Sequence, residues 1–199
     1  MTLKSLGEKI FIMKRLLLIL ILTFSIQSLT KADDIKDFEI EGISIGDSAL
    51  DLFNRKEIKE YSSVPPNLTN TSYSQSCFDN YRDIYDRICV AYNKNSKKKI
   101  IEMVQAQIIF EKDVMPICRK KQYEVDNDLS TIFKDLERAD WGKKKLKGIE
   151  DLDLDAYYYP ITYDFIDNSR IQIACYNILN ESILKVAVYN LKFGIVLRK

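Results

Sequence analysis

Apolar and polar side chains alternate with a period of two residues over much of the chain, the pattern typical of β-strands. Residues 35–45 alternate loosely and predict a short first strand or an extended lead-in. Residues 84–92 and 99–110 flank the polar turn NKNSKK and predict an antiparallel hairpin. Short polar breaks separate three further alternating segments, which predict an antiparallel meander: 157–166, 170–176 and 183–193.

The first arm of the hairpin carries a second pattern. Apolar residues recur at helical spacing in 78–92, at Phe78, Tyr81, Tyr85, Ile88 and Tyr92. Ile88, Val90 and Tyr92 also alternate, however, and the segment is rich in β-branched residues. We therefore favour a strand and keep a helix as the alternative.

Two other segments have the 3.6-residue period of an amphipathic helix. Ser48 and Asp51 fit the capping box, so we expect a helix from Ser48 to about residue 61 with these two side chains as its cap. A longer helix is expected over 116–138, with a proline in its first turn. Its apolar stripe consists of Val125, Leu129, Ile132, Phe133 and Leu136. The polar segment 62–74 and the charged segment 140–156 are expected to be loops.

The order strand, helix, hairpin, helix, meander predicts an α+β fold. We expect an antiparallel sheet of about four to five strands with two helices packed on one face. A single domain over residues 33–199 is expected to hold all of these elements.

The amino-terminal segment has the features of a cleavable signal peptide. Lys14 and Arg15 precede an uncharged run over 16–30, and small residues at Thr30 and Ala32 fit a cleavage site after Ala32. The run is shorter than the roughly 20 residues of a membrane-spanning helix, which favours cleavage over an anchor. Met13 is an equally good start for this segment. The sequence thus predicts a periplasmic or secreted protein.

Charge argues against one class of partner. The 167 residues after Ala32 hold 25 basic and 28 acidic residues, a net charge of −3. A nucleic-acid partner held mainly by its phosphates is therefore not expected. The lysine runs 97–99 and 143–145 have two interpretations, contact with anionic lipid or polysaccharide and simple solvated turns, of which the second is favoured.

Four cysteines and the absence of histidine restrict the chemistry. In an exported domain an even number of cysteines favours disulfides. We favour the pair Cys118–Cys175, which leaves Cys77–Cys89 as the second pair. No metal site or cofactor is expected, because zinc sites with histidine are impossible here and the acidic row at Asp151, Asp153 and Asp155 lacks the glycine and glutamate of an EF-hand loop.

Gly46-Asp47-Ser48 resembles the way GDSL hydrolases present their serine nucleophile. Such a serine needs a base, and in that family the base is a histidine near the carboxyl end. This chain has no histidine, so a hydrolase that used Ser48 would have to be atypical and use another side chain as the base. We instead expect Ser48 to cap a helix.

Three longer stretches resemble a family of short exported proteins from marine bacteria with AT-rich genomes. They are KADDIKDFEIEGISIGDSALDLF, ICRKKQYEVDNDLSTIF and YDFIDNSRIQIACY. The resemblance implies an exported domain and supplies no catalytic residues. It is incomplete near Cys175, where Asn168 replaces the expected Asp-Gly turn.

Tyr157, Tyr158 and Tyr159 are the remaining binding candidates. Three consecutive tyrosines of a strand cannot all face one core, so at least one is expected to be exposed. The sequence therefore favours a non-enzymatic, exported binding domain that contacts an envelope component or a protein through its sheet or this strand. The alternatives are the atypical serine hydrolase and a thiol-redox accessory protein using Cys118, at a helix amino end.

Overall fold

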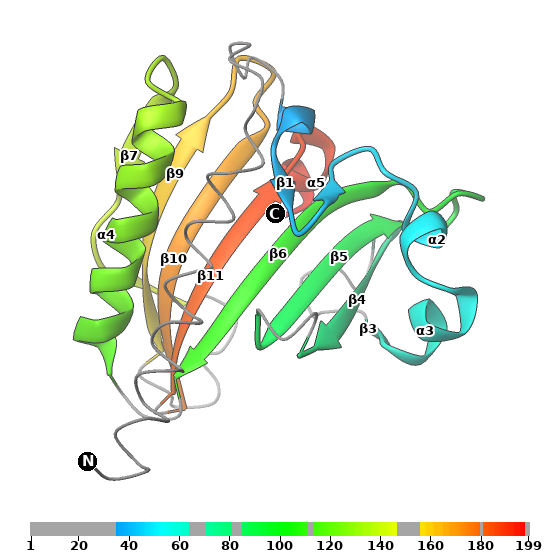
Figure 1. Cartoon of the computed structure of the whole chain (residues 1–199), viewed down its shortest axis with the longest axis horizontal. Helices are drawn as coiled ribbons and strands as arrows, with labels where there is room; N and C mark the ends of the chain where they lie inside the picture. Colours follow the sequence, from blue (N-terminus) through cyan, green and yellow to red (C-terminus); the bar gives the residue numbers. More distant parts are fainter. Residues whose placement is uncertain are drawn as a thin grey trace, which may run out of the picture.

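The computed structural model describes residues 35–63, 71–80, 85–110, 114–146, 156–179 and 181–197. The predicted signal peptide, with Met13 and Ala32, lies outside these residues. Nine strands form one large antiparallel sheet (Figure 1). Their order across the sheet is β3 (Ser62–Ser63), β4 (Tyr73–Asp79), β5 (Arg87–Asn93), β6 (Ile101–Phe110), β11 (Glu181–Tyr189), β10 (Arg170–Ile178), β9 (Tyr157–Asp164) and β7 (Glu137–Asp140), with β8 (Lys144–Lys145) also paired to β9.

The predicted fold class is wrong, because the protein is mostly sheet. The large sheet has nine strands rather than four or five, and β1 (Glu39–Ile40) and β2 (Ile43–Ser44) form a separate two-stranded sheet. Of the extra strands, β3 and β8 lie in segments predicted to be loops, and β7 begins in the last two residues of the predicted helix 116–138. Edge strands such as β3, β7 and β8 are two to four residues long and polar, so they carry no alternating pattern.

One long helix, α4 (Met115–Ile132), packs on β10 and β11 at one end of the sheet (Figure 1). It ends at Ile132 rather than at 138, since the chain turns back there to form β7. The helix predicted from Ser48 is instead two short helices, α2 (Ala49–Leu52) and α3 (Arg55–Glu60), separated by extended backbone at Phe53 and Asn54.

The strand interpretation of the hairpin is confirmed. Phe78 lies in β4 and residues 87–92 lie in β5, while β6 forms the second arm, and no described residue of 78–92 is helical. The last meander segment is only partly a strand: β11 ends at Tyr189, and α5 (Leu191–Leu197) follows. The Asn190 side chain accepts a hydrogen bond from Phe193 N at 3.0 Å, which starts this last helix.

The main hydrophobic core lies between one face of the sheet and the elements in front of it in Figure 1, namely α4, η1 (Ile35–Asp37), β1, β2 and α2. Strand residues Ile88, Val104 and Ile171 are fully buried there. The reverse face carries a smaller cluster in which Phe193 of α5 packs edge-on against Tyr73, at 5.3 Å between ring centroids. The sheet is thus thickly covered on one face and only locally on the other.

Three side chains one helical turn apart join α4 to the sheet. Cys118 forms a disulfide with Cys175 on β10. The Gln122 amide, fully buried, donates to Tyr159 O at 2.6 Å and to Ile173 O at 2.8 Å. Asp126 completes the row with contacts to Arg138 and Tyr163. This polar stripe fixes the helix in one register on the sheet.

Candidate functional site

Ser48 lies directly before α2, but its side chain does not cap the helix. Its hydroxyl donates to Lys98 O at 2.9 Å, in the turn between β5 and β6. The predicted capping by Ser48 and Asp51 is therefore wrong, because the Ser48 hydroxyl is hydrogen-bonded to the β5–β6 turn instead of to the first turn of α2. The capping box of this region belongs to α3, where the Asn54 side chain accepts from Lys56 N and Glu57 N.

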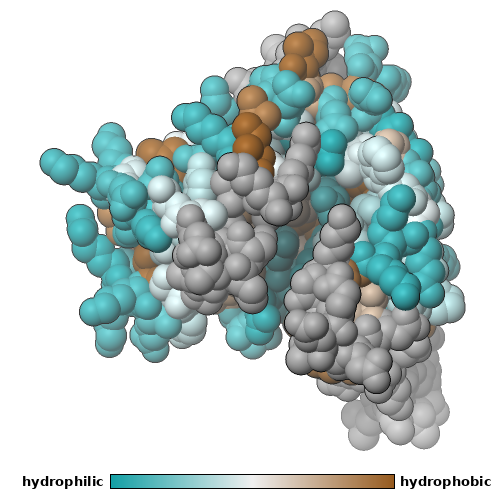
Figure 2. Space-filling view, turned by 180° about the vertical axis from the view of Figure 1, so that it is seen from behind, coloured by the Kyte–Doolittle hydropathy of each residue, from teal (hydrophilic) through white to brown (hydrophobic). Residues whose placement is uncertain are grey.

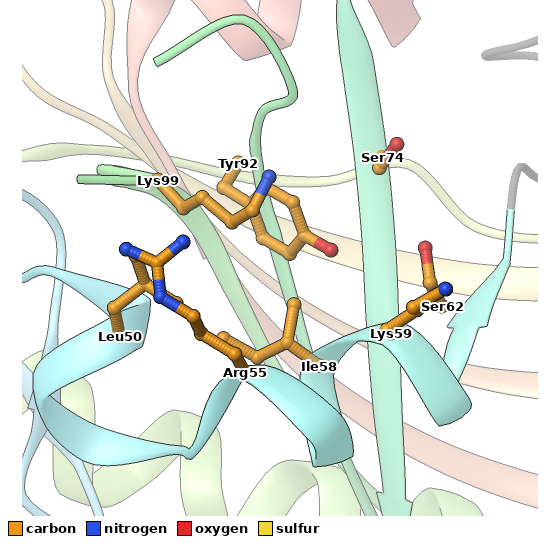
Figure 3. Close-up of a pocket in the computed structure, with 8 residues that line it drawn as sticks. All are labelled: Leu50, Arg55, Ile58, Lys59, Ser62, Ser74, Tyr92 and Lys99. Carbon is orange, nitrogen blue, oxygen red and sulfur yellow. The ribbon is translucent and has the colours of Figure 1, made fainter. Parts of the chain in front are cut away.

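A pocket of about 290 Å³ opens beside these helices (Figure 3). Helices α2 and α3 form one side of it, and β4, β5 and the β5–β6 turn form the other. The lining residues are Leu50, Arg55, Ile58, Lys59, Ser62, Ser74, Tyr92 and Lys99. Acidic residues are absent from this lining.

Three cations stand around the pocket. Arg55 and Lys59 are four residues apart on α3, so both lie on the same side of that helix. Lys99 comes from the opposite wall and adopts a left-handed backbone conformation, with φ of 50°. None of the three forms an ion pair with a carboxylate in the part of the chain that the structure describes. Among the described residues, the pocket is thus lined by three cations that no carboxylate pairs.

Tyr92 forms the floor of the pocket and is only 2% exposed. The Ser76 hydroxyl donates to Ile58 O at 3.0 Å, so the 3.0 Å contact between the Ser76 and Tyr92 hydroxyls has Tyr92 as its donor. This hydrogen bond holds the ring flat beneath Lys99, whose Nζ lies 4.9 Å from the ring centroid.

The remaining lining is mixed. Leu50 and Ile58 supply apolar surface, and Ser62 and Ser74 supply hydroxyl groups (Figure 3). The three cations can attract an anionic group to this pocket, and the apolar and hydroxyl side chains can contact the rest of a small ligand. Both the shape and the charge are suited to binding.

Sequence reasoning missed this site. Lys99 belongs to the run 97–99, for which we favoured a solvated turn, and Arg55 and Lys59 had no role. The i, i+4 spacing of Arg55 and Lys59 is a signal in the sequence. What the sequence does not show is that the turn before β6 folds over α3.

The three candidate tyrosines at the start of β9 lie on alternate faces of the sheet. Tyr157 and Tyr159 pack against the main core, whereas Tyr158 stacks on Tyr176 on the reverse face, at 5.1 Å between ring centroids. All three are partly buried, so the expected exposed tyrosine is not found. The reason is that neighbouring side chains, Lys143 over Tyr157 among them, cover the rings.

The structure joins Cys118 to Cys175 and Cys77 to Cys89, the two pairs favoured from the sequence. The redox alternative needs an accessible thiolate at Cys118, but that residue is fully buried and its sulfur is bonded. The acidic row at Asp151, Asp153 and Asp155 lies outside the described residues.

Comparison of the chain with protein-family models, with curated proteins and with solved structures found no match. The resemblance to exported marine proteins therefore stays a prediction. Among the helices that the structure describes, none combines the length and apolar character needed to cross a membrane.

Proposed function

We propose that the chain is an exported, non-enzymatic binding domain that holds an anionic group of a cell-envelope component in the pocket between α3 and the β5–β6 turn. The observation that carries this proposal is the set of three cations, Arg55, Lys59 and Lys99, around a pocket floored by Tyr92. None of the three has a carboxylate partner among the residues that the structure describes. Two disulfides support an oxidising location such as the periplasm or the exterior.

The strength of such binding follows from the exposure of the cations. Charge pairs near the surface contribute about 0.2 to 1 kcal/mol each. Three of them, with the hydrogen bonds and apolar contacts of a small ligand, give about 4 kcal/mol, a Kd near 1 mM. The natural ligand is expected to add contacts outside the pocket to this anchor.

The test is a titration of the mature, disulfide-bonded protein followed by NMR chemical shifts at low salt. Glycerol 3-phosphate and glucuronate serve as the phosphate and carboxylate probes, and glycerol and glucose as their neutral counterparts. We expect saturable shifts of the Arg55, Lys59 and Lys99 amide signals with at least one anion. The neutral compounds should cause none. The stronger of the two anions identifies the chemistry of the envelope component.

A matched pair of triple variants provides the control. Replacement of Arg55, Lys59 and Lys99 by glutamine should weaken anion binding at least tenfold. Replacement of Lys56, Lys94 and Lys97 by glutamine removes the same charge from exposed positions on the same helix and turn, outside the pocket. Equal binding by the two triple variants, or equal shifts with neutral and anionic probes, would overturn the proposal.

A further inference from the structure

The Cys77–Cys89 disulfide lies on the reverse face of the sheet, opposite α4, which is largely hydrophilic (Figure 2). Ile88 and Val90, the neighbours of Cys89 on β5, pack in the main core, so the Cys89 side chain points to the opposite face. Cys77 is its direct partner across β4 and β5. The disulfide therefore joins two neighbouring strands on the face of the sheet that other elements cover only locally.

The two disulfides differ in their access to solvent. Cys77 is partly exposed, whereas Cys89 and both cysteines of Cys118–Cys175 are fully buried. Thiol–disulfide exchange begins when a thiolate attacks one sulfur of the disulfide, and its rate depends on access to that sulfur. Of the four cysteines of the chain, all of which the structure describes, Cys77 is therefore the one open to a thiolate from solution.

Each sulfur of this disulfide accepts a hydrogen bond from a glutamine side chain. Gln75 Nε2 donates to Cys77 Sγ at 3.0 Å, and Gln107 Nε2 donates to Cys89 Sγ at 3.7 Å. A hydrogen bond to the charged form of a thiol favours that form, and a sulfur that is more stable as a thiolate leaves a disulfide faster. Both sulfurs thus have a donor in place for the moment at which the S–S bond breaks.

The backbone holds the two cysteines opposite each other independently of their sulfurs. Strands β4 and β5 are paired over seven residues each, and the hydrogen bonds of this ladder involve only backbone groups. On its other side β5 is paired with β6. Reduction should therefore leave the strands in register, so that the same disulfide can form again.

We propose that Cys77–Cys89 is a thiol–disulfide exchange site that accepts two electrons from a dithiol, while Cys118–Cys175 stays oxidised. The basic pocket, which we define as the pocket between α3 and the β5–β6 turn, lies on the other face of the sheet. The exchange site therefore does not depend on the function proposed for that pocket.

The exchange has two steps and needs only the dithiol. A thiolate of the dithiol attacks Cys77 Sγ, the S–S bond breaks, and the electron pair leaves on Cys89 Sγ, next to the Gln107 amide. The second thiolate of the dithiol then attacks its own sulfur in the mixed disulfide and expels the Cys77 thiolate, next to the Gln75 amide. The dithiol is oxidised to a disulfide. The protein gains two electrons, and its two thiolates take up the two protons that the dithiol has lost.

The test treats the mature, disulfide-bonded protein at pH 7 with dilute dithiothreitol and traps free thiols with iodoacetamide at timed intervals. Peptide mapping by mass spectrometry then gives the rate at which each cysteine becomes free. We expect Cys77 and Cys89 to be trapped at least about tenfold faster than Cys118 and Cys175, because of the difference in access. When the monothiol glutathione replaces dithiothreitol, the mixed disulfide should form on Cys77 and the trapped thiol should be Cys89.

Two controls decide the interpretation. In urea the difference between the two disulfides should disappear, since it depends on the folded sheet. Gln107→Leu should slow the reduction of Cys77–Cys89 several-fold, because it removes the donor to the leaving sulfur. Gln172→Leu is the matched control, since this glutamine lies on the same face of the sheet but contacts tyrosine hydroxyls. It should leave the rate unchanged.

The wild-type rates alone are sufficient if a variant does not fold. Trapping of Cys118 and Cys175 as fast as that of Cys77 and Cys89 in the folded protein would overturn the proposal. So would glutathione attached to Cys89 instead of Cys77, or a circular dichroism spectrum showing that reduction of Cys77–Cys89 unfolds the sheet.

Discussion

Asp126 on α4 is expected to be among the most important polar residues for stability. Its side chain is 6% exposed and accepts two hydrogen bonds from Arg138, at 2.8 Å from Nε and 2.6 Å from the terminal nitrogen. The buried Tyr163 hydroxyl donates to the same carboxylate at 2.6 Å. Asp126→Ala removes all three of these side-chain bonds, which join the end of α4 to β7 and β9.

The expected cost follows from the exposure of each partner. A hydrogen bond to a charged group contributes about 1.5 to 3 kcal/mol. The Arg138 side chain is 37% exposed, so water replaces much of what its guanidinium loses. The Tyr163 hydroxyl keeps Asp126 O as a second acceptor at 2.9 Å. We therefore expect a loss of about 3 kcal/mol in the free energy of unfolding rather than the sum of three full bonds.

A double-mutant cycle in urea measures the coupling directly. Asp126→Ala and Arg138→Met, singly and together, are compared at pH 7 with the disulfides intact. We expect a coupling energy above about 1 kcal/mol. The control is the pair Lys121–Glu124 on the same helix, with side chains 29% and 36% exposed, for which we expect less than about 0.5 kcal/mol. Equal coupling in the two cycles would refute the reasoning.

The same pair predicts a pH dependence. Burial alone would raise the pKa of Asp126, but the hydrogen bonds from Arg138 and Tyr163 outweigh it and lower the pKa below its usual value of 3.8. A carboxyl with a lowered folded-state pKa stabilises the fold fully above its usual pKa, and this contribution disappears as pH falls through the folded-state value. Unfolding titrations should therefore show a loss of stability below about pH 4 that is smaller in Asp126→Ala.

Two further predictions concern the disulfides and the helix caps. Cys118 and Cys175 are 57 residues apart, so by chain entropy the loss of their disulfide should lower the free energy of unfolding by about 4 kcal/mol. The loss of Cys77–Cys89, which spans 12 residues, should lower it by about 3 kcal/mol. Urea unfolding of the two double-alanine variants measures this order, and the reverse order would contradict this account. Asn54→Ala should cost about 1 kcal/mol in the same assay because it caps α3, whereas Ser48→Ala, which caps nothing, should cost less than about 0.5 kcal/mol. A loss of about 1 kcal/mol or more in the free energy of unfolding of Ser48→Ala would contradict the conclusion that this side chain does not cap α2.

The parts of the fold that were predictable are those with a long, one-sided pattern. Alternate residues of β9, β10 and β11 pack against the main core, and α4 presents Val125 and Leu129 at helical spacing, so the positions of these elements are visible in the sequence. Strands β3, β7 and β8 exist because a neighbouring strand offers free backbone groups, a cause that lies outside their own residues. Prediction from local sequence fails at Ser48 for the same reason. Its hydroxyl, which the local pattern predicts to cap a helix, donates to Lys98 O in the β5–β6 turn, 50 residues away in the sequence.

The basic pocket was missed from the sequence for a related reason, since its walls come from segments distant in the sequence. Strand alternation explains how the walls are held in place. On β4 and β5, Ser74 and Tyr92 line the pocket and Ser76 lies on the same face of the sheet, while Cys77 and Cys89, directly paired across the two strands, face the other way. The disulfide can therefore fix the spacing of the strands that carry the floor without occupying the pocket. Because Ser76 also accepts the Tyr92 proton and donates to Ile58 of α3, the bond network connects that floor to the helix bearing Arg55 and Lys59. The bracing reaches α3 because the hydrogen bond from Ser76 to Ile58 O crosses from the sheet to that helix.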